Sequence, residues 1–150
     1  MIDDKNKKIL RVLMNNARLS IRKIAKITGI KPSSVFQRMK KLEENEIIKG
    51  YTVKLNREKM GYGVEAFVLI TFKKEDNITQ EQVAKELMRI DNVIEVHIIT
   101  GDWDLLAKVI TKDVKDLGKL ITEKIRKIKG VDKTFTIVSL QNFGEKFPFI

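Results

Sequence analysis

The sequence contains no cysteine and a single histidine, His97. Without cysteine, the chain has no disulfide framework and no thiolate metal site. A lone histidine without a second ligand nearby is typical of a structural or surface position. A Walker loop and a dinucleotide-binding glycine pattern are also missing. We therefore expect a protein that is not an enzyme and that uses no metal and no cofactor.

Long apolar runs are missing as well. No stretch approaches the ~18 residues that a membrane span needs, and the N-terminus lacks the basic and then apolar pattern of a signal peptide. We expect a cytoplasmic protein with no membrane partner. The 150 residues are enough for one medium domain or two small ones.

Positive charge is confined to one part of the chain. Residues 1–60 hold 16 Lys and Arg against 6 Asp and Glu, which leaves +10, whereas residues 61–150 hold 14 of each sign. A surface that only needs charge for solubility would not require this segregation. A one-sided basic segment indicates a polyanion partner, because neutralising phosphates releases condensed counterions. We expect that partner to be double-stranded DNA.

Three short helices are predicted in this basic segment. Ala25, Gly29 and Val35 have the spacing of a helix-turn-helix, in which a small residue, a glycine corner and a branched apolar residue let two helices pack. After them, two short strands around Gly50 would make a small wing. The predicted elements are helices from Asp3 or Asp4 to about Asn15, from Ser20 to Gly29 and from Lys31 or Ser33 to Glu44, and wing strands within 47–56.

The third helix is the expected recognition helix. If Val35, Met39 and Leu42 point inward, a polar face is left for the major groove of DNA. Gln37 is suited to adenine, and Phe36 to a thymine methyl, with a place in the core as the alternative for Phe36. Lysine and arginine side chains there would contact phosphates. The candidate DNA-binding residues are Lys31, Ser33, Ser34, Phe36, Gln37, Arg38, Lys40, Lys41 and Lys49.

The rest of the chain predicts a β-α-β-β-α-β order, that of a ferredoxin-like (ACT-like) α+β domain with an antiparallel sheet. Helices would cover one face of this sheet only. Its strands are apolar on both sides, so a second copy of the chain is the simplest cover for the other face, and we expect a homodimer. The expected domains are a winged helix-turn-helix DNA-binding domain at 1–56, a hinge at 57–63 and an effector-binding, oligomerising domain at 64–150.

Several motifs together resemble the Lrp/AsnC (feast/famine) family of transcription regulators. These are Asn16-Ala17-Arg18, Ile24-Ala25, Gly29-Ile30, Arg38-Met39-Lys40-Lys41-Leu42-Glu43, Ile47-Ile48-Lys49-Gly50-Tyr51 and Thr100-Gly101-Asp102-Trp103-Asp104. The resemblance implies amino-acid sensing by the second half, with dimers that assemble further into octamers. It places effectors between dimers, near Thr100, Gly101, Asp102, Asp104, Thr134 and Thr136. The alternative for these six residues is a plain turn at a subunit interface.

Three functions remain open from the sequence. The first is a regulator that binds pseudo-palindromic promoter sites as a dimer or higher oligomer. The second is an architectural protein that coats DNA with little sequence preference, which the abundance of lysine favours. The third is an enzyme or its metabolite-binding subunit, against which the missing catalytic residues count.

Overall fold

The computed structural model describes residues 2–74, 77–145 and 147 of the chain. The molecule divides into two compact units, one built on Met1–Lys54 and the other on Leu55–Phe143. The predicted hinge at 57–63 belongs to the second unit, where the N–H groups of Gly61 and Tyr62 close a turn by donating to the carbonyls of Glu58 and Arg57, both at 2.9 Å. The second unit ends at Phe143, whereas the predicted domain extends to residue 150. No helix within the described residues is long and apolar enough to cross a membrane.

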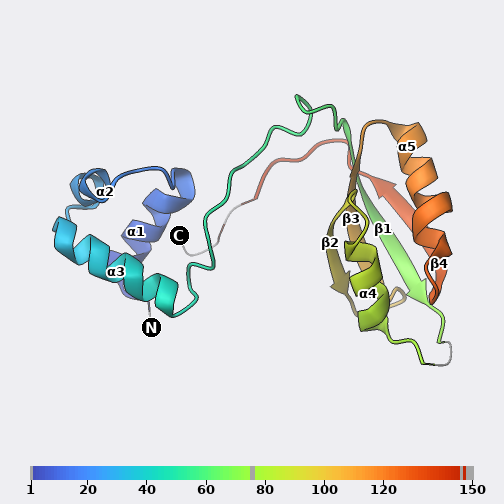
Figure 1. The fold of residues 1–150 in the computed structure, drawn as a ribbon. Helices are drawn as coiled ribbons and strands as arrows, with labels where there is room; N and C mark the ends of the chain where they lie inside the picture. Colours follow the sequence, from blue (N-terminus) through green and yellow to red (C-terminus); the bar gives the residue numbers. More distant parts are fainter. Residues whose placement is uncertain (1, 75–76, 146, 148–150) are drawn as a thin grey trace. The chain divides into compact units, whose positions relative to one another are not determined.

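The first unit contains three helices, as its local signals predict (Figure 1). The Asp3 carboxylate caps the first helix and the Ser20 hydroxyl the second, since each accepts a backbone N–H of the first turn. Gly29, at φ 70°, ends the second helix in the left-handed conformation. The helix-turn-helix is confirmed, with helices α1 (Asp4–Asn15), α2 (Ile21–Thr28) and α3 (Pro32–Glu44).

The prediction of two strands in the wing is wrong. Residues 47–56 contain no strand. An isolated two-stranded hairpin is marginal in water, and Val53 and Leu55, which are 72% and 62% exposed, bury too little surface to support one. The start of the segment instead ends α3, because the N–H groups of Ile47 and Ile48 donate to the carbonyl of Leu42 at 2.9 and 3.0 Å.

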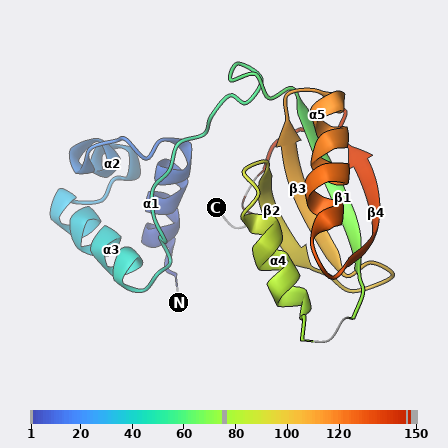
Figure 2. The same cartoon turned by 45° about the vertical axis from the view of Figure 1, so that its right-hand side comes forward.

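The second unit is a four-stranded antiparallel sheet with the order β2-β3-β1-β4 and helices on one face (Figure 2). The predicted ferredoxin-like α+β fold is confirmed. Its last helix begins as an α-helix, but its final turns are π-helical and then 3₁₀. The elements are β1 (Val64–Phe72), α4 (Gln80–Met88), β2 (Val93–Ile98), β3 (Leu105–Thr111), α5 (Val114–Lys119), a π-helical turn (Leu120–Lys124), a 3₁₀ turn (Ile125–Lys127) and β4 (Val131–Val138).

The two faces of the sheet differ in burial. On β1, Ala66, Val68 and Ile70 are fully buried in the core that the helices complete. The alternate residues point to the other face, which we call the open face. There Leu69 lies between its cross-strand partners, Leu106 on β3 and Phe135 on β4.

Candidate nucleic-acid interface and effector positions

The exposed side of α3 carries most of the predicted DNA contacts. Val35 and Leu42 are buried against the other helices, so the opposite side of α3 is turned outward. Gln37, Lys40 and Lys41 are exposed, and Phe36 is 51% exposed, which excludes a place for it in the core. Lys31 and Ser33 are exposed at the start of the helix, and Lys49 is exposed on the irregular segment after it. Ser34 is half-buried.

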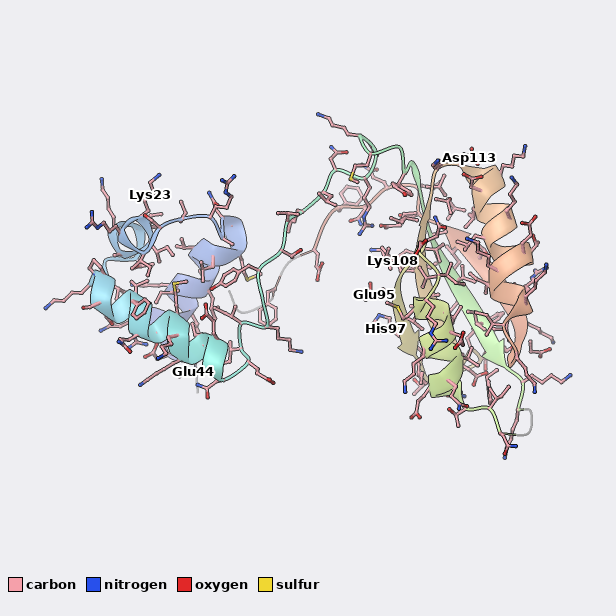
Figure 3. All side chains as sticks on the ribbon, in the orientation of Figure 1. Lys23, Glu44, Glu95, His97, Lys108 and Asp113 are labelled. Carbon is pink, nitrogen blue, oxygen red and sulfur yellow. The ribbon has the colours of Figure 1, made fainter. Side chains whose placement is uncertain are left out.

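Helix α2 also carries cationic side chains, which are Arg22, Lys23 and Lys26. Lys23 lies on α2 and Glu44 near the end of α3 (Figure 3). The Glu44 carboxylate lies 3.6 Å from the ammonium nitrogen of Lys40, one turn earlier on α3. Since such exposed pairs are weak, a phosphate can compete for Lys40.

Arg38 differs from the other predicted contacts because its side chain is hydrogen-bonded to residues at the start of another helix, α1. Its Nη1 donates to both carboxylate oxygens of Asp3, at 2.8 and 2.7 Å, and to Oδ1 of Asn6 at 2.8 Å. These bonds join α3 to the N-terminal turn of α1. Together with the Asn6 backbone N–H, which also binds the carboxylate, Arg38 lowers the pKa of Asp3.

A groove of about 710 Å³ lies beside this ion pair. The helix α3 contributes Ser34, Gln37, Arg38 and Lys41 to its walls, and α1 contributes Asn6 with the capping Asp3. The same groove therefore contains hydrogen-bond donors suited to a phosphate and one carboxylate, that of Asp3.

The predicted effector residues divide into free and committed groups. Thr100, Gly101 and Asp102 are exposed in the turn between β2 and β3. Asp104 is committed to the fold: its Oδ2 accepts the Phe72 N–H at 2.7 Å and its Oδ1 accepts the Gln80 amide at 3.1 Å. Asp104 therefore joins β1 and α4, which leaves Asp102 as the carboxylate of the turn without a hydrogen-bond partner among the described residues.

Thr134 and Thr136 lie on β4, at the same end of the sheet as this turn. Thr134 pairs with Ile70, which pairs in turn with Leu105, the first residue of β3. Two strand spacings, roughly 10 Å, therefore separate Thr134 from β3. Thr134 also accepts a hydrogen bond from Nε of Arg126 at 3.0 Å. The turn and β4 meet on the open face, where the rings of Trp103 and Phe135 are 6.0 Å apart.

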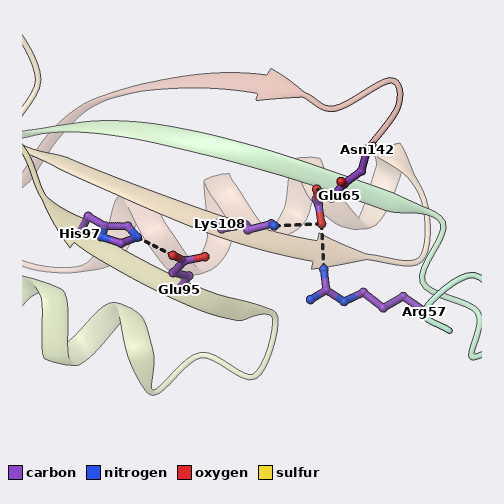
Figure 4. A network of polar contacts seen from close by, with 6 residues as sticks. All are labelled: Arg57, Glu65, Glu95, His97, Lys108 and Asn142. Atoms are coloured by element: carbon purple, nitrogen blue, oxygen red, sulfur yellow. Dashed lines mark hydrogen bonds and ion pairs between the residues drawn. The ribbon is translucent and has the colours of Figure 1, made fainter. Parts of the chain in front are cut away.

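The open face also holds a polar network that the sequence reasoning missed (Figure 4). The Glu65 carboxylate lies 2.8 Å from Arg57 and 3.4 Å from Lys108, and the Lys108 ammonium lies 5.6 Å from the centre of the Phe67 ring. On β2, the lone His97 pairs with Glu95 at 2.6 Å. Alternation along β2 is enough to place Glu95 and His97 on one face, but only the register between β1 and β3 brings Lys108 to Glu65.

Both units match models of known families. Residues 2–49 match the winged helix-turn-helix DNA-binding model, and residues 65–148 match the Lrp/AsnC ligand binding domain. The chain belongs to the Lrp/AsnC family.

Relatives of this Lrp/AsnC protein share nearly its whole length. An uncharacterized HTH-type transcriptional regulator of Pyrococcus furiosus is 40% identical over 146 residues, 97% of each chain. The HTH-type transcriptional regulator LrpA of Pyrococcus abyssi is 37% identical over 141 residues, 94% of this chain and 98% of LrpA. This Lrp/AsnC protein is therefore a transcription regulator with a helix-turn-helix and a ligand-binding-type domain.

Solved structures of the Lrp/AsnC family have the same fold. AsnC of Escherichia coli superposes with a TM-score of 0.89 at 27% identity, over 100% of this chain and 99% of AsnC. The complex of the regulator NMB0573 of Neisseria meningitidis with L-Met gives a TM-score of 0.91 at 23% identity, over 97% of this chain and 94% of that one. At that identity, the second match supports the fold alone.

Proposed function

We propose that this Lrp/AsnC protein is a sequence-specific, double-stranded DNA-binding transcription regulator. The observation that carries the proposal is the coincidence of an exposed polar face on α3 with the +10 charge of residues 1–60. A helix of this kind enters the major groove, while the surrounding cations hold the phosphates.

The roles of the side chains follow from their exposure. Gln37 reads a base edge, with adenine as the best geometric match, and Phe36 packs on a thymine methyl. Lys31, Lys40 and Lys41, with Lys49 on the segment beyond α3, contact phosphates and set affinity rather than sequence preference. Ser33 and Ser34, in the first turn of α3, have short side chains whose hydroxyl groups would contact a base or the DNA backbone.

The open face of the sheet is proposed as the homodimer interface. Phe135 and Ile137 are 54% and 46% exposed there, and they continue the apolar surface of Phe67 and Leu69. Contiguous apolar surface of this kind is usually covered by a partner. Two-fold symmetry would place the two α3 helices on pseudo-palindromic half-sites about one helical turn apart. Dimers would associate further into octamers.

An amino acid is the proposed effector. At the exposed turn, the Asp102 carboxylate would receive the ammonium group, and backbone N–H groups around Thr100 and Gly101 would take the carboxylate. Thr134 and Thr136 on β4 complete the candidate set. The match of residues 65–148 to the Lrp/AsnC ligand binding domain supports a small-molecule ligand for this unit.

In vitro selection from random duplexes at physiological salt tests the DNA-binding proposal. Enrichment of a short inverted repeat is the expected result. Tight, salt-sensitive binding without enrichment would instead establish an architectural protein, which the lysine-rich charge would then explain.

The effector proposal needs its own measurement. The affinity for the selected duplex is compared with and without each L-amino acid, with the wild type and with Asp102→Asn. At least one amino acid should change the wild-type affinity and have less effect on the variant. If no amino acid shifts the wild-type affinity or thermal stability, the turn is only an interface element.

A further inference from the structure

The ion pair between Arg38 and Asp3 lies at the groove beside α3. It is partly open to solvent, since the side chains of Arg38 and Asp3 are 26% and 54% exposed. All of the hydrogen bonds that the Arg38 side chain makes to described residues use Nη1. Within that part of the chain, its Nε and Nη2 donors are unused.

Arginine binds phosphate through the same donors with which it binds a carboxylate, and it prefers two parallel hydrogen bonds. Solvent-exposed ion pairs contribute little to stability, so displacing one costs little. The other donors needed at a phosphate site are present, because Ser34 and Lys41 line the same groove. The Asp3 carboxylate, which is ionised at neutral pH, is the group in the groove lining that opposes an anion there.

We propose that this groove binds one phosphate of the DNA backbone through Arg38, Lys41 and Ser34, and that Asp3 competes with that phosphate for Arg38. The inference rests on the proposed DNA-binding function. Non-specific complexes depend on phosphate contacts, whereas specific complexes also have base contacts. Competition by Asp3 therefore weakens non-specific binding more than specific binding and raises the discrimination between sequences.

Asp3→Asn is the variant that isolates this competition. Asparagine caps a helix as well as aspartate does, so α1 keeps its start while the charge is lost. Asp4→Asn is the matched control, because it removes the same charge at the next residue. The Asp4 carboxylate lies 3.8 Å from the ammonium nitrogen of Lys7. Both variants gain equally from the change in net charge, and only Asp3→Asn releases Arg38.

Binding to a random-sequence duplex is measured for both variants over a range of salt concentrations. Asp3→Asn should bind about five- to tenfold more tightly than Asp4→Asn, the gain from one charge-assisted contact. Its logarithmic salt dependence should be steeper by up to about 0.9, since Arg38 then neutralises the phosphate in the groove without competition from Asp3. In an Arg38→Ala background the two variants should bind alike. Asp3→Ser, which keeps a good cap without a carboxylate, should reproduce the result if Asp3→Asn folds poorly.

Equal affinities and equal salt slopes for the two variants would overturn the proposal and leave the ion pair as a clamp between α1 and α3. A persisting difference in the Arg38→Ala background would overturn it too. If the wild-type protein binds no duplex at any salt concentration, the proposed function itself fails and the groove proposal falls with it. That result is distinct from duplex binding that is insensitive to Asp3.

Discussion

Gly130 and Val83 approach so closely that a Cβ on Gly130 would lie 2.8 Å from Cγ2 of Val83. Gly130 also has a φ of +94°, a region that other residues adopt at a cost. Strand β4 begins directly after it, so this contact sets where the last strand enters the sheet. Gly130 and Val83 lie 47 positions apart in the sequence, so the contact with α4 appears only in the folded structure.

Gly130→Ala should lower the free energy of unfolding by about 2–4 kcal/mol, the sum of overpacking and a left-handed backbone. Gly61→Ala is the control, since its φ is +87° with no atom within 4 Å of the added Cβ. It should cost only about 1 kcal/mol. Urea unfolding followed by the fluorescence of Trp103 reports on this unit. Equal losses for the two variants would show that packing against Val83 contributes nothing.

Glu46 adopts a φ of 54° just beyond α3, a position at which glycine is favoured. Glu46→Gly should therefore stabilise the first unit by about 0.5–1 kcal/mol. Glu44→Gly, within the last turn of α3, should destabilise it by up to about 1 kcal/mol. Thermal unfolding followed by circular dichroism compares the two variants. If Glu46→Gly does not raise the unfolding temperature, the prediction is wrong.

Tyr51 donates a hydrogen bond to Glu43 at 2.7 Å. Burial and the adjacent carboxylate raise the pKa of Tyr51 to about 12. In a Tyr62→Phe variant, where Tyr51 is the remaining tyrosine, the phenolate absorbance should have its midpoint near that value, and Glu43→Gln should lower it. A raised pKa means that the stabilisation is complete below the unfolded value of about 10 and is lost as the pH rises toward 12. A midpoint near 10 in the Tyr62→Phe variant would rule out the hydrogen bond in solution.

Gln37→Ala should blur sequence preference, because the proposed base contact is lost. Lys41→Ala should instead weaken binding to all duplexes alike and flatten the salt dependence by about 0.9. Titrations of the selected site and of a scrambled duplex at several salt concentrations separate these effects. If both variants lose the same affinity for both duplexes, the orientation of α3 on DNA is wrong.

Ile137 and Val138 adjoin on β4 and point to opposite faces of the sheet. Their side chains are similarly exposed, at 46% and 41%. Ile137→Lys should break the proposed dimer through the open face, whereas Val138→Lys should leave it intact. Light scattering after gel filtration gives the oligomeric state. An assembly unchanged by Ile137→Lys would place the interface elsewhere.

Helix ends and periodic segments could be predicted from the sequence because their causes are local. Asp3 and Ser20 cap the helices that their positions predict, and Gly29 makes the expected corner. The structure of the wing could not be predicted from local signals. The alternation of apolar and polar residues between 51 and 55 does not show whether another strand will pair with this segment. Arg38 was predicted to contact DNA from its type and position, and Asp104 an effector from the family resemblance. Both instead bind groups of the protein that are distant in sequence.

The sequence by itself determined the segregation of charge, the order of the elements and the membership of the Lrp/AsnC family. Composition, capping and hydrophobic period depend on neighbours within a few residues, so they can be read along the chain. Only the tertiary structure decided which charged groups remain available. Arg38 is hydrogen-bonded to Asp3, which lies 35 positions away in the sequence, and Asp104 to Phe72, which lies 32 positions away. Hydrogen bonds between residues so far apart in the sequence depend on helix packing and strand register, and a linear pattern specifies neither.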